Sequence, residues 1–561
     1  MSTEARGFVA VDGGTATTGV SLIGLVDRAW RLLGSTAAPA AIPVDALVDL
    51  LARRLAAADP DLAASVGLPA TTARGAASPV ESWPRIGVAT AAPPRLAVVA
   101  ATERTVGALS RAARGAGWDV TAASVAGADV IEMTNLLLER DVSTVLAGSA
   151  DPVGGDERNA LPELAALVAA AARRRPGVTV VLAGALGEHE GRVGEGARAG
   201  AAERHDGADP GVDAGAATGS VMVAPSATAG EPPGEPLRAL LDGLARATRD
   251  DGRRATVRAV ATLASVLDRT VELVDVGFSA GLRVVATPGE PGTDPDVRWA
   301  VTRSGALVPD AAPDEIVDGV LAWSVIALDR HRMRDRLREL RETPWADADG
   351  DGALLRLAVA RAAVVRLVAA TKAIEPRSAP DLVLAAGGAW AVAPGPAIAL
   401  GLADVLRRAG ASQLAYDHAR LLGPLGSIDD PVRRRSILAD LADDLLAPLG
   451  GVVVPAGLRP GRSAGRLVVH AAGGSTELDL VPGGLELVDL PPGESAVAEL
   501  QFRDQVSLGT RGRRFALELG GGLGGLLIDL RDVPLRLPDR LERRRELLAA
   551  WQQSLWAGIE Q

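Results

Sequence analysis

Near the start of the chain, two short apolar runs at residues 8–11 and 20–23 resemble β-strands and enclose a turn. The turn holds one carboxylate, Asp12, together with three glycines and three threonines. Small residues of this kind let backbone N–H groups wrap around a phosphate. They also suit an ordinary hairpin, in which glycine and threonine serve only turn and strand geometry. The pattern by itself leaves a nucleotide site and a plain hairpin open.

Further along the chain, the apolar pattern alternates between strand-like and helix-like segments from residue 96 to residue 183. This alternation predicts parallel strands joined by crossover helices. One predicted strand, residues 142–147, leads into a small-residue turn that ends at Asp151. Loops at such strand ends often contact ligands, although a solvated turn acid is the alternative for Asp151. Ala, Pro, Ser and Gly dominate residues 58–94, which predicts an irregular connection there.

The opening hairpin pattern returns at residues 271–285, as a strand with Asp275, then Gly277 and Ser279 in a small turn, then a second strand. One such hairpin is common. Two of them, each at the start of an α/β half, predict a duplicated fold around a cleft. A third small-residue turn, Gly387-Gly388, follows a buried strand and either admits a flat ligand or makes a tight turn.

The same patterns predict where the chain divides. Residues 184–219 are rich in Gly, Ala, Asp and Glu with little periodicity, which indicates a flexible loop or linker. Short apolar runs between Gly and Pro turns begin near residue 446, and an amphipathic helix closes the chain. The predicted parts are a first α/β domain over 1–183, the linker 184–219, a second α/β domain over 220–445, a β-rich domain over 446–537, and a C-terminal amphipathic helix over 538–561.

Composition narrows the functional classes. The net charge of −11 argues against a general nucleic-acid binder, and the absence of cysteine excludes disulfides, thiolate metal sites and cysteine nucleophiles. We find neither a secretory signal nor an apolar run of about twenty residues, so we expect a cytoplasmic protein without a membrane partner. Lys372 is the only lysine. This bias indicates genomic composition and makes single arginines weak indicators of function.

The two hairpins and the Gly-Gly turn, in this order, resemble the actin, sugar-kinase and heat-shock chaperone ATPase superfamily. The resemblance implies an α/β fold with duplicated actin-like, ribonuclease H-like domains around a nucleotide cleft, plus the β-rich domain. It also implies ATP and Mg²⁺ as cofactors, with the first two turns holding phosphates and the third contacting adenosine. Asp12 and Asp275 are the implied catalytic residues and metal ligands. The implied nucleotide-binding residues are Gly14, Thr15, Thr17, Thr18, Asp151, Gly277, Ser279, Gly387 and Gly388.

More narrowly, the chain is similar to the MutL/GlmL family encoded beside coenzyme-B12-dependent glutamate mutase, which is distinct from the mismatch-repair protein. The family's Asp-x-Gly-Ser-Thr-Thr-Thr-Lys motif resembles residues 12–19, and its Leu-Ala-Gly-Gly-x-Asp-Gly-Gly segment resembles residues 146–155. Its Gly-Gly turn and a later Asp-x-x-x-Leu-x-Pro-x-Leu-Gly segment resemble residues 387–426. This resemblance implies an accessory protein, of chaperone or reactivating type, for an adenosylcobalamin-dependent mutase such as glutamate (methylaspartate) mutase. The implied partners are the mutase subunits.

The second hairpin departs from the family pattern. Phe278 replaces a glycine, Ala280 and Gly281 lack the family's hydroxyls, and Leu282 replaces a carboxylate, while Gly19 stands where the first motif has lysine. ATP hydrolysis depends on positioning and on stabilising phosphoryl charge, so these losses predict weak hydrolysis. Two alternatives stay open: a non-hydrolysing binding scaffold, and a small-molecule kinase whose phosphoacceptor base would be Asp151 or Asp275.

Overall fold

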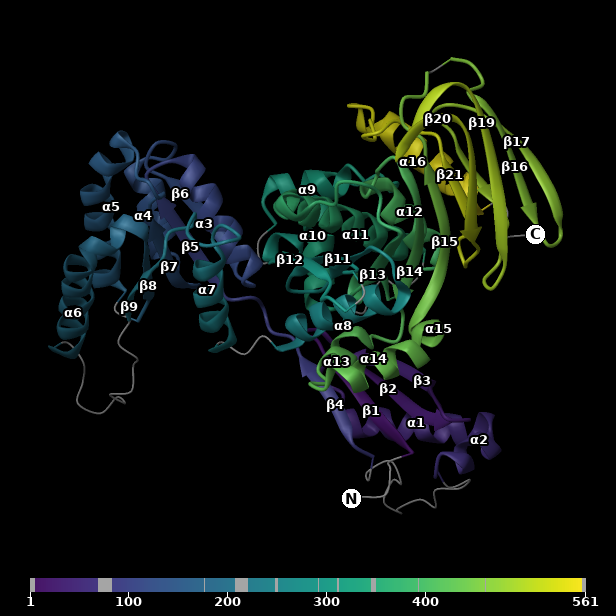
Figure 1. The fold of residues 1–561 in the computed structure, drawn as a ribbon, viewed down its shortest axis with the longest axis horizontal. Helices are drawn as coiled ribbons and strands as arrows, with labels where there is room; N and C mark the ends of the chain where they lie inside the picture. The colour runs from purple at the N-terminus through teal and green to yellow at the C-terminus, as the bar shows by residue number, and fades with distance from the viewer. Residues whose placement is uncertain are drawn as a thin grey trace. The chain divides into compact units, whose positions relative to one another are not determined.

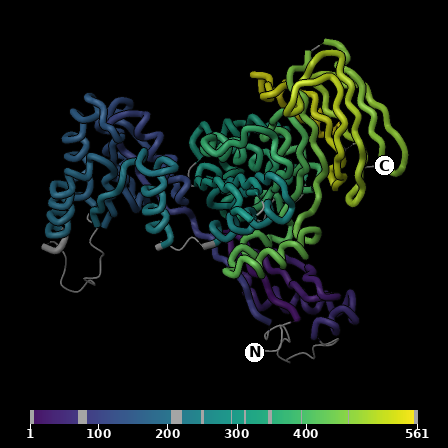
Figure 2. Tube along the Cα trace, in the orientation of Figure 1, coloured from purple at the N-terminus to yellow at the C-terminus, as the bar shows by residue number. Residues whose placement is uncertain are grey.

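The computed structural model describes residues 6–68, 83–175, 177–206, 220–247, 251–290, 292–309, 312–344, 350–391, 393–459 and 461–556. The chain forms two compact units, whose folds are drawn in Figure 1 and traced in Figure 2. The first unit comprises residues 1–91, 251–299 and 303–561, and the second comprises residues 92–250 and 300–302. These boundaries differ from the predicted ones after residues 183 and 219. The reason is that the alternating segment starting at residue 96 builds a sheet of its own.

The first unit begins with a four-stranded sheet in the order β3-β2-β1-β4. Strand β1 pairs antiparallel with β2 and parallel with β4. Helix α1 buries Leu47, Leu51 and Leu55 in the core beside this sheet, as its apolar spacing requires. The elements are β1 Gly7–Gly13, β2 Thr17–Val26, β3 Ala29–Pro39, α1 Val44–Ala58, α2 Pro60–Ser65 and β4 Arg85–Ala89.

Helix α2 and strand β4 lie in the region over residues 58–94 that was predicted to be an irregular connection, so that prediction is wrong for them. Residues 69–82 of the same region lie outside the described residues.

An eight-stranded sheet in the same unit starts in the same way, with the order β12-β11-β10-β13 followed by β14-β15-β21-β18. Strand β10 pairs antiparallel with β11 and parallel with β13, as β1 does with β2 and β4. These strands are β10 Val271–Val276, β11 Gly281–Thr287, β12 Asp296–Thr302, β13 Leu382–Ala386, β14 Gly410–Asp417, β15 Leu446–Val454, β18 Leu485–Val488 and β21 Leu526–Asp529. The strand pattern predicted to repeat is therefore repeated in the pairing of the two sheets.

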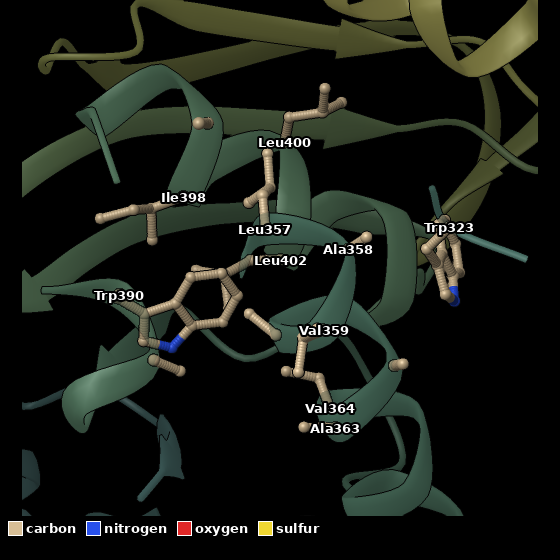
Figure 3. Close-up of a cluster of buried hydrophobic side chains, with 14 of the residues drawn as sticks. Trp323, Leu357, Ala358, Val359, Ala363, Val364, Trp390, Ile398, Leu400 and Leu402 are labelled. Atoms are coloured by element: carbon tan, nitrogen blue, oxygen red, sulfur yellow. The ribbon is translucent and has the colours of Figure 1, made fainter. Parts of the chain in front are cut away.

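Helices pack around the second sheet and enclose a large apolar core. Figure 3 shows part of this core, in which Trp390 lies beside side chains of α11 and α12. Helix α11 contributes buried residues on several sides, as expected for a helix inside a protein. The helices are α8 Asp251–Leu267, α9 Asp314–Leu321, α10 Arg330–Glu342, α11 Gly350–Ala370, α12 Gly395–Val405, α13 Leu422–Gly426, α14 Pro431–Asp440 and α15 Ala442–Leu445.

The second unit contains a five-stranded sheet in the order β6-β5-β7-β8-β9, and every pair in it is parallel. The prediction of parallel strands with crossover helices is confirmed for this segment. Its elements are β5 Arg95–Ala100, α3 Glu103–Gly115, β6 Asp119–Ser124, α4 Val130–Leu138, β7 Val142–Gly148, α5 Gly155–Arg174, β8 Thr179–Ala183, α6 Glu190–Asp206, β9 Val221–Ala224 and α7 Glu235–Ala247.

Helix α6 occupies much of the predicted linker over residues 184–219, so that prediction is wrong for residues 184–206. Its glycines reflect close packing. A Cβ on Gly196 or Gly200 would collide with the backbone carbonyl of Ala169 or Arg173 on α5. Glycine here allows two helices to approach each other, a role that composition does not distinguish from flexibility. Residues 207–219 lie outside the described residues.

The C-terminal part is rich in strands, as predicted, but the strands divide between two sheets. Strands β15, β18 and β21 extend the eight-stranded sheet, and the others form an antiparallel sheet in the order β17-β16-β19-β20. The final helix, α16 Leu541–Trp556, buries Leu548, Trp551 and Leu555, the apolar side that its spacing predicts. The antiparallel strands are β16 Gly465–Ala471, β17 Gly474–Leu480, β19 Ser495–Leu508 and β20 Thr510–Gly520. Among the helices of the described residues, none combines the length and the apolarity needed to cross a membrane.

Candidate functional site

A cavity of about 290 Å³ lies in the first unit, lined by the turns of both hairpins and by the Gly-Gly turn after β13. The loop that follows β14, the helices α8 and α11 and the end of strand β3 also line it. The cavity therefore brings together segments that lie far apart in the sequence. The predicted site residues that line it are Asp12, Gly14, Thr15, Thr17, Asp275, Gly277, Gly387 and Gly388.

The two hairpins reach this cavity with the same geometry. In the first, Asp12 lies opposite Gly19, and Gly14 N–H donates to the carbonyl of Thr17 at 3.0 Å. In the second, Asp275 lies opposite Leu282, and Gly277 N–H donates to the carbonyl of Ala280 at 3.0 Å. The turns of the two hairpins thus have the same length, and the strands pair in the same register around the aspartates. Their two aspartates occupy equivalent positions on equivalent strands.

Strand alternation explains why Thr18, a predicted site residue, falls outside the lining. Neighbouring residues of a strand point to opposite faces, so Thr17 faces the cavity while Thr18 points away from it and is buried. Ser279 lies in the second turn but does not line the cavity either. Asp151 belongs to the second unit, so its assignment to this site stays a prediction.

The Gly-Gly turn fits closely against the second hairpin. Gly387 has φ of 92°, and a Cβ there would overlap the Asp275 carboxylate and the Val276 carbonyl. Only glycine therefore satisfies both the backbone angle and the space at position 387. At Gly388 a Cβ would make only ordinary contacts, with Arg420 Nη2 at 3.5 Å and Thr17 Oγ1 at 4.0 Å, so the space there does not require a second glycine.

A third carboxylate, Asp417, lines the cavity at the end of β14. It is buried and accepts hydrogen bonds from the backbone N–H groups of Leu421 at 2.9 Å and Leu422 at 3.2 Å. Asp417 is the aspartate that begins the segment resembling the family's Asp-x-x-x-Leu-x-Pro-x-Leu-Gly, but it is not among the predicted site residues. Its position after a strand of the same sheet as Asp275 is the signal that could have identified it.

Burial shifts the titration of all three carboxylates. It raises the pKa of Asp12, against the attraction of Arg420. Burial and then the nearby Asp12 raise the pKa of Asp275 to about 6, while Arg253 and Arg420 oppose this rise. Burial also raises the pKa of Asp417 to about 7, against the two backbone hydrogen bonds, and the other two aspartates add to the rise. The clustered carboxylates are therefore stabilised either by protonation or by binding a cation.

These carboxylates fit a hydrated magnesium ion, which binds through one or two protein carboxylates together with water and phosphate oxygens. A cation would offset the clustered negative charge that raises these pKa values. Throughout the described ranges, no group of three or more His, Cys, Asp or Glu side chains is arranged to enclose a metal. Asp12 and Asp275 would therefore hold the ion only with ligand and water oxygens completing its shell. Bound there, magnesium would neutralise phosphate charge.

Three arginines from separate elements line the same cavity: Arg253 on α8, Arg356 on α11 and Arg420 after β14. Arg356 Nη2 donates to the Gly388 carbonyl at 2.9 Å, and Arg420 Nη1 donates to Thr17 Oγ1 at 2.7 Å. None of the three was predicted from the sequence, because arginine is abundant throughout this chain and no motif distinguishes these positions. Guanidinium groups bind phosphate and carboxylate well, so the cavity suits an anionic ligand.

No protein-family model matches the chain, and no curated protein matches it. Similar solved structures include acetone carboxylase in its nucleotide-free form, at 13% identity and a TM-score of 0.28, covering 75% of this chain and 70% of that one. The PilM–PilN type IV pilus biogenesis complex is 11% identical with a TM-score of 0.22, and the match covers 77% of this chain and 98% of that one. A carbohydrate kinase from Novosphingobium aromaticivorans is 11% identical with a TM-score of 0.22, and the match covers 76% of this chain and 92% of that one. Such low identities and TM-scores assign the chain to no family.

Proposed function

We propose that the first unit binds a magnesium-bound nucleoside triphosphate, with ATP as the first candidate. The observation that carries this proposal is the meeting of two hairpins of identical register, each bringing one aspartate and a glycine turn to one cavity. Carboxylates and arginines around the cavity suit a ligand that combines phosphate groups with a divalent cation. Phe278, Leu307 and Pro344 add apolar surface that suits a nucleobase.

We further propose that the protein is an accessory factor, of chaperone or reactivating type, for an adenosylcobalamin-dependent mutase such as glutamate mutase. The support is the order of the motifs from Asp12 to Gly426, as in the MutL/GlmL family. Mechanistically, a nucleotide would change affinity for the mutase subunits by binding more tightly to one arrangement of the cavity walls than to another.

We propose weak hydrolysis at most. Thr15 and Phe278 occupy equivalent places in the two turns, and Thr17 is equivalent to Ala280. The second hairpin therefore lacks the hydroxyl donors of the first, and hydrolysis depends on such donors to stabilise phosphoryl charge. The alternatives are a scaffold that binds without hydrolysis and a small-molecule kinase.

Calorimetric titration with magnesium-ATP tests the binding proposal. We expect saturable binding by the wild-type protein. Asp12→Asn and Asp275→Asn should each weaken it by roughly tenfold or more, because each removes a charged ligand of the cation. Asp479→Asn, at an exposed position on β17, is the matched control and should bind like the wild type. A flat wild-type titration would leave only a scaffold without nucleotide.

Phosphate release distinguishes the accessory role from the kinase. Purified glutamate mutase subunits should bind the protein with an affinity that changes when magnesium-ATP is added, and should increase any phosphate release. Transfer of phosphate to a sugar or an organic acid, with no response to the mutase subunits, would instead identify a kinase.

A further inference from the structure

One face of strand β2 contacts the segment that follows β14. Thr17, Gly19 and Ser21 alternate along β2 and therefore share this face. Thr17 Oγ1 accepts the 2.7 Å hydrogen bond from Arg420 Nη1, and Ser21 Oγ donates to the carbonyl of Ala419 at 3.0 Å. Between these two contacts, a Cβ on Gly19 would lie only 2.9 Å from Arg420 Cδ. The Arg420 side chain therefore passes directly over Gly19.

The loop that carries Arg420 is fixed in an uncommon conformation. Arg420 has φ of 54°, in the left-handed region that residues with side chains seldom adopt. Asp417 stabilises the loop by accepting the N–H groups of Leu421 and Leu422. Such conformations persist where surrounding contacts determine them, and they are frequent at ligand sites.

The guanidinium lies between the first hairpin and the Gly-Gly turn. It donates to Thr17 of the first hairpin, and Arg420 Nη2 is 3.5 Å from where a Cβ on Gly388 would lie. Arg420 also lines the same cavity as Asp12 of the first hairpin and Asp275 of the second. It therefore shares one cavity wall with both hairpins.

We propose that Arg420 binds the polyphosphate of the ligand, and that Gly19 is required because it leaves room for the Arg420 side chain. This inference rests on the proposed nucleotide site. A guanidinium has five N–H donors, and after one serves Thr17 the others can form charge-assisted hydrogen bonds with phosphate oxygens. The loop after β14 thus supplies a positive charge and N–H donors to a cavity whose second hairpin, at Phe278 and Ala280, lacks the hydroxyl groups of Thr15 and Thr17.

The test uses the full chain and two probes, magnesium-ATP and inorganic tripolyphosphate with magnesium. Arg420→Gln should weaken binding of both probes by about 10- to 100-fold, since it removes a charge-assisted contact to phosphate. It should also make binding less dependent on salt concentration. Arg420→Lys keeps the charge but loses the planar fork, so it should bind more tightly than Arg420→Gln and less tightly than the wild type.

Gly19→Ala tests the steric part of the proposal while leaving Arg420 in place. The added methyl group should displace the side chain and weaken both probes about tenfold or more. Gly34→Ala on β3 is its matched control, because that Cβ would only touch Leu51 Cδ2 at 3.6 Å. It should bind both probes within about twofold of the wild type. Thermal unfolding of every variant checks that each one folds.

Two results would overturn the inference alone: wild-type binding of both probes by Arg420→Gln, or equal effects of Gly19→Ala and Gly34→Ala. If Arg420→Gln does not fold, Arg420→Lys is measured in its place, and binding of both probes as tight as that of the wild type would contradict the proposal. A wild-type protein that binds neither probe would overturn the proposed nucleotide site and this inference with it.

Discussion

At the scale of single residues, Asp417 links the chemistry of the cavity to stability. Its pKa is raised by burial from 3.8 to about 7, so the folded protein holds a proton that the unfolded chain releases. The resulting stabilisation is complete below about pH 4 and is lost as the pH rises through 7. A shift of this size corresponds to about 4 kcal/mol.

Asp417→Asn should therefore flatten the dependence of stability on pH between about 4 and 8, because asparagine carries no titrating proton while its one oxygen still accepts one of the two backbone N–H groups. Urea unfolding at several pH values, with metal chelated and nucleotide absent, measures the free energy of unfolding. The exposed Asp479→Asn variant should keep the wild-type slope. Parallel curves for wild type and Asp417→Asn would contradict the assignment of a protonated Asp417.

Local sequence pattern predicted where Asp12 and Asp275 lie, while their roles as ligands stay a prediction. Asp12 and Asp275 were predicted to meet, and the structure places both at one cavity. Arg420 could not be predicted in this way, since its contact with Thr17 joins positions 403 residues apart. Thr18 was predicted to bind the nucleotide, but it does not line the cavity, because strand alternation directs its side chain away from that of Thr17.

At the scale of elements, the end of β13 offers a sharp contrast between adjacent glycines. Gly387→Ala should destabilise the fold by roughly 1–3 kcal/mol, since alanine at φ of 92° is strained and its methyl group overlaps the Asp275 carboxylate. Gly388→Ala should change stability by less than about 0.5 kcal/mol, because its methyl group finds only ordinary contacts. Chemical denaturation of the two variants checks this. Equal losses would show that the turn does not depend on the conformation of Gly387.

Element predictions failed where glycine had a packing role. In α6 the glycines allow contact with α5, yet their frequency predicted a linker. Strand β4 was missed because Pro84 and nearby small residues favoured an irregular connection, whereas its parallel pairing with β1 decides its conformation. Tertiary contacts overrode local preference in both segments.

At the scale of the whole molecule, the repeated hairpin predicted the repeated strand order, because register and turn length are encoded locally. The second unit was not recognised as an insertion. Its strands and helices alternate like those of any α/β segment, and the sequence carries no mark of where the first unit resumes. The structure shows where the first unit resumes, because Gly252 lies so close to Thr90 that a Cβ on Gly252 would collide with the Thr90 hydroxyl. The two ends of the interrupted first unit are therefore adjacent.

This adjacency predicts that the second unit can be removed. Replacing residues 92–250 with a short Gly/Ser linker closes a small gap at a modest entropic cost. All the residues that line the cavity belong to the first unit, so the shortened protein should unfold cooperatively and bind magnesium-ATP within about threefold of the full chain. Residues 300–302, which group with the second unit, remain in the shortened protein, and Thr302 there loses its 3.2 Å hydrogen bond to Asp119, so some loss of stability is expected. Calorimetry and thermal unfolding of the shortened protein provide the measurement. A folded product that binds no nucleotide, beside a full chain that does, would show that the second unit contributes to the site.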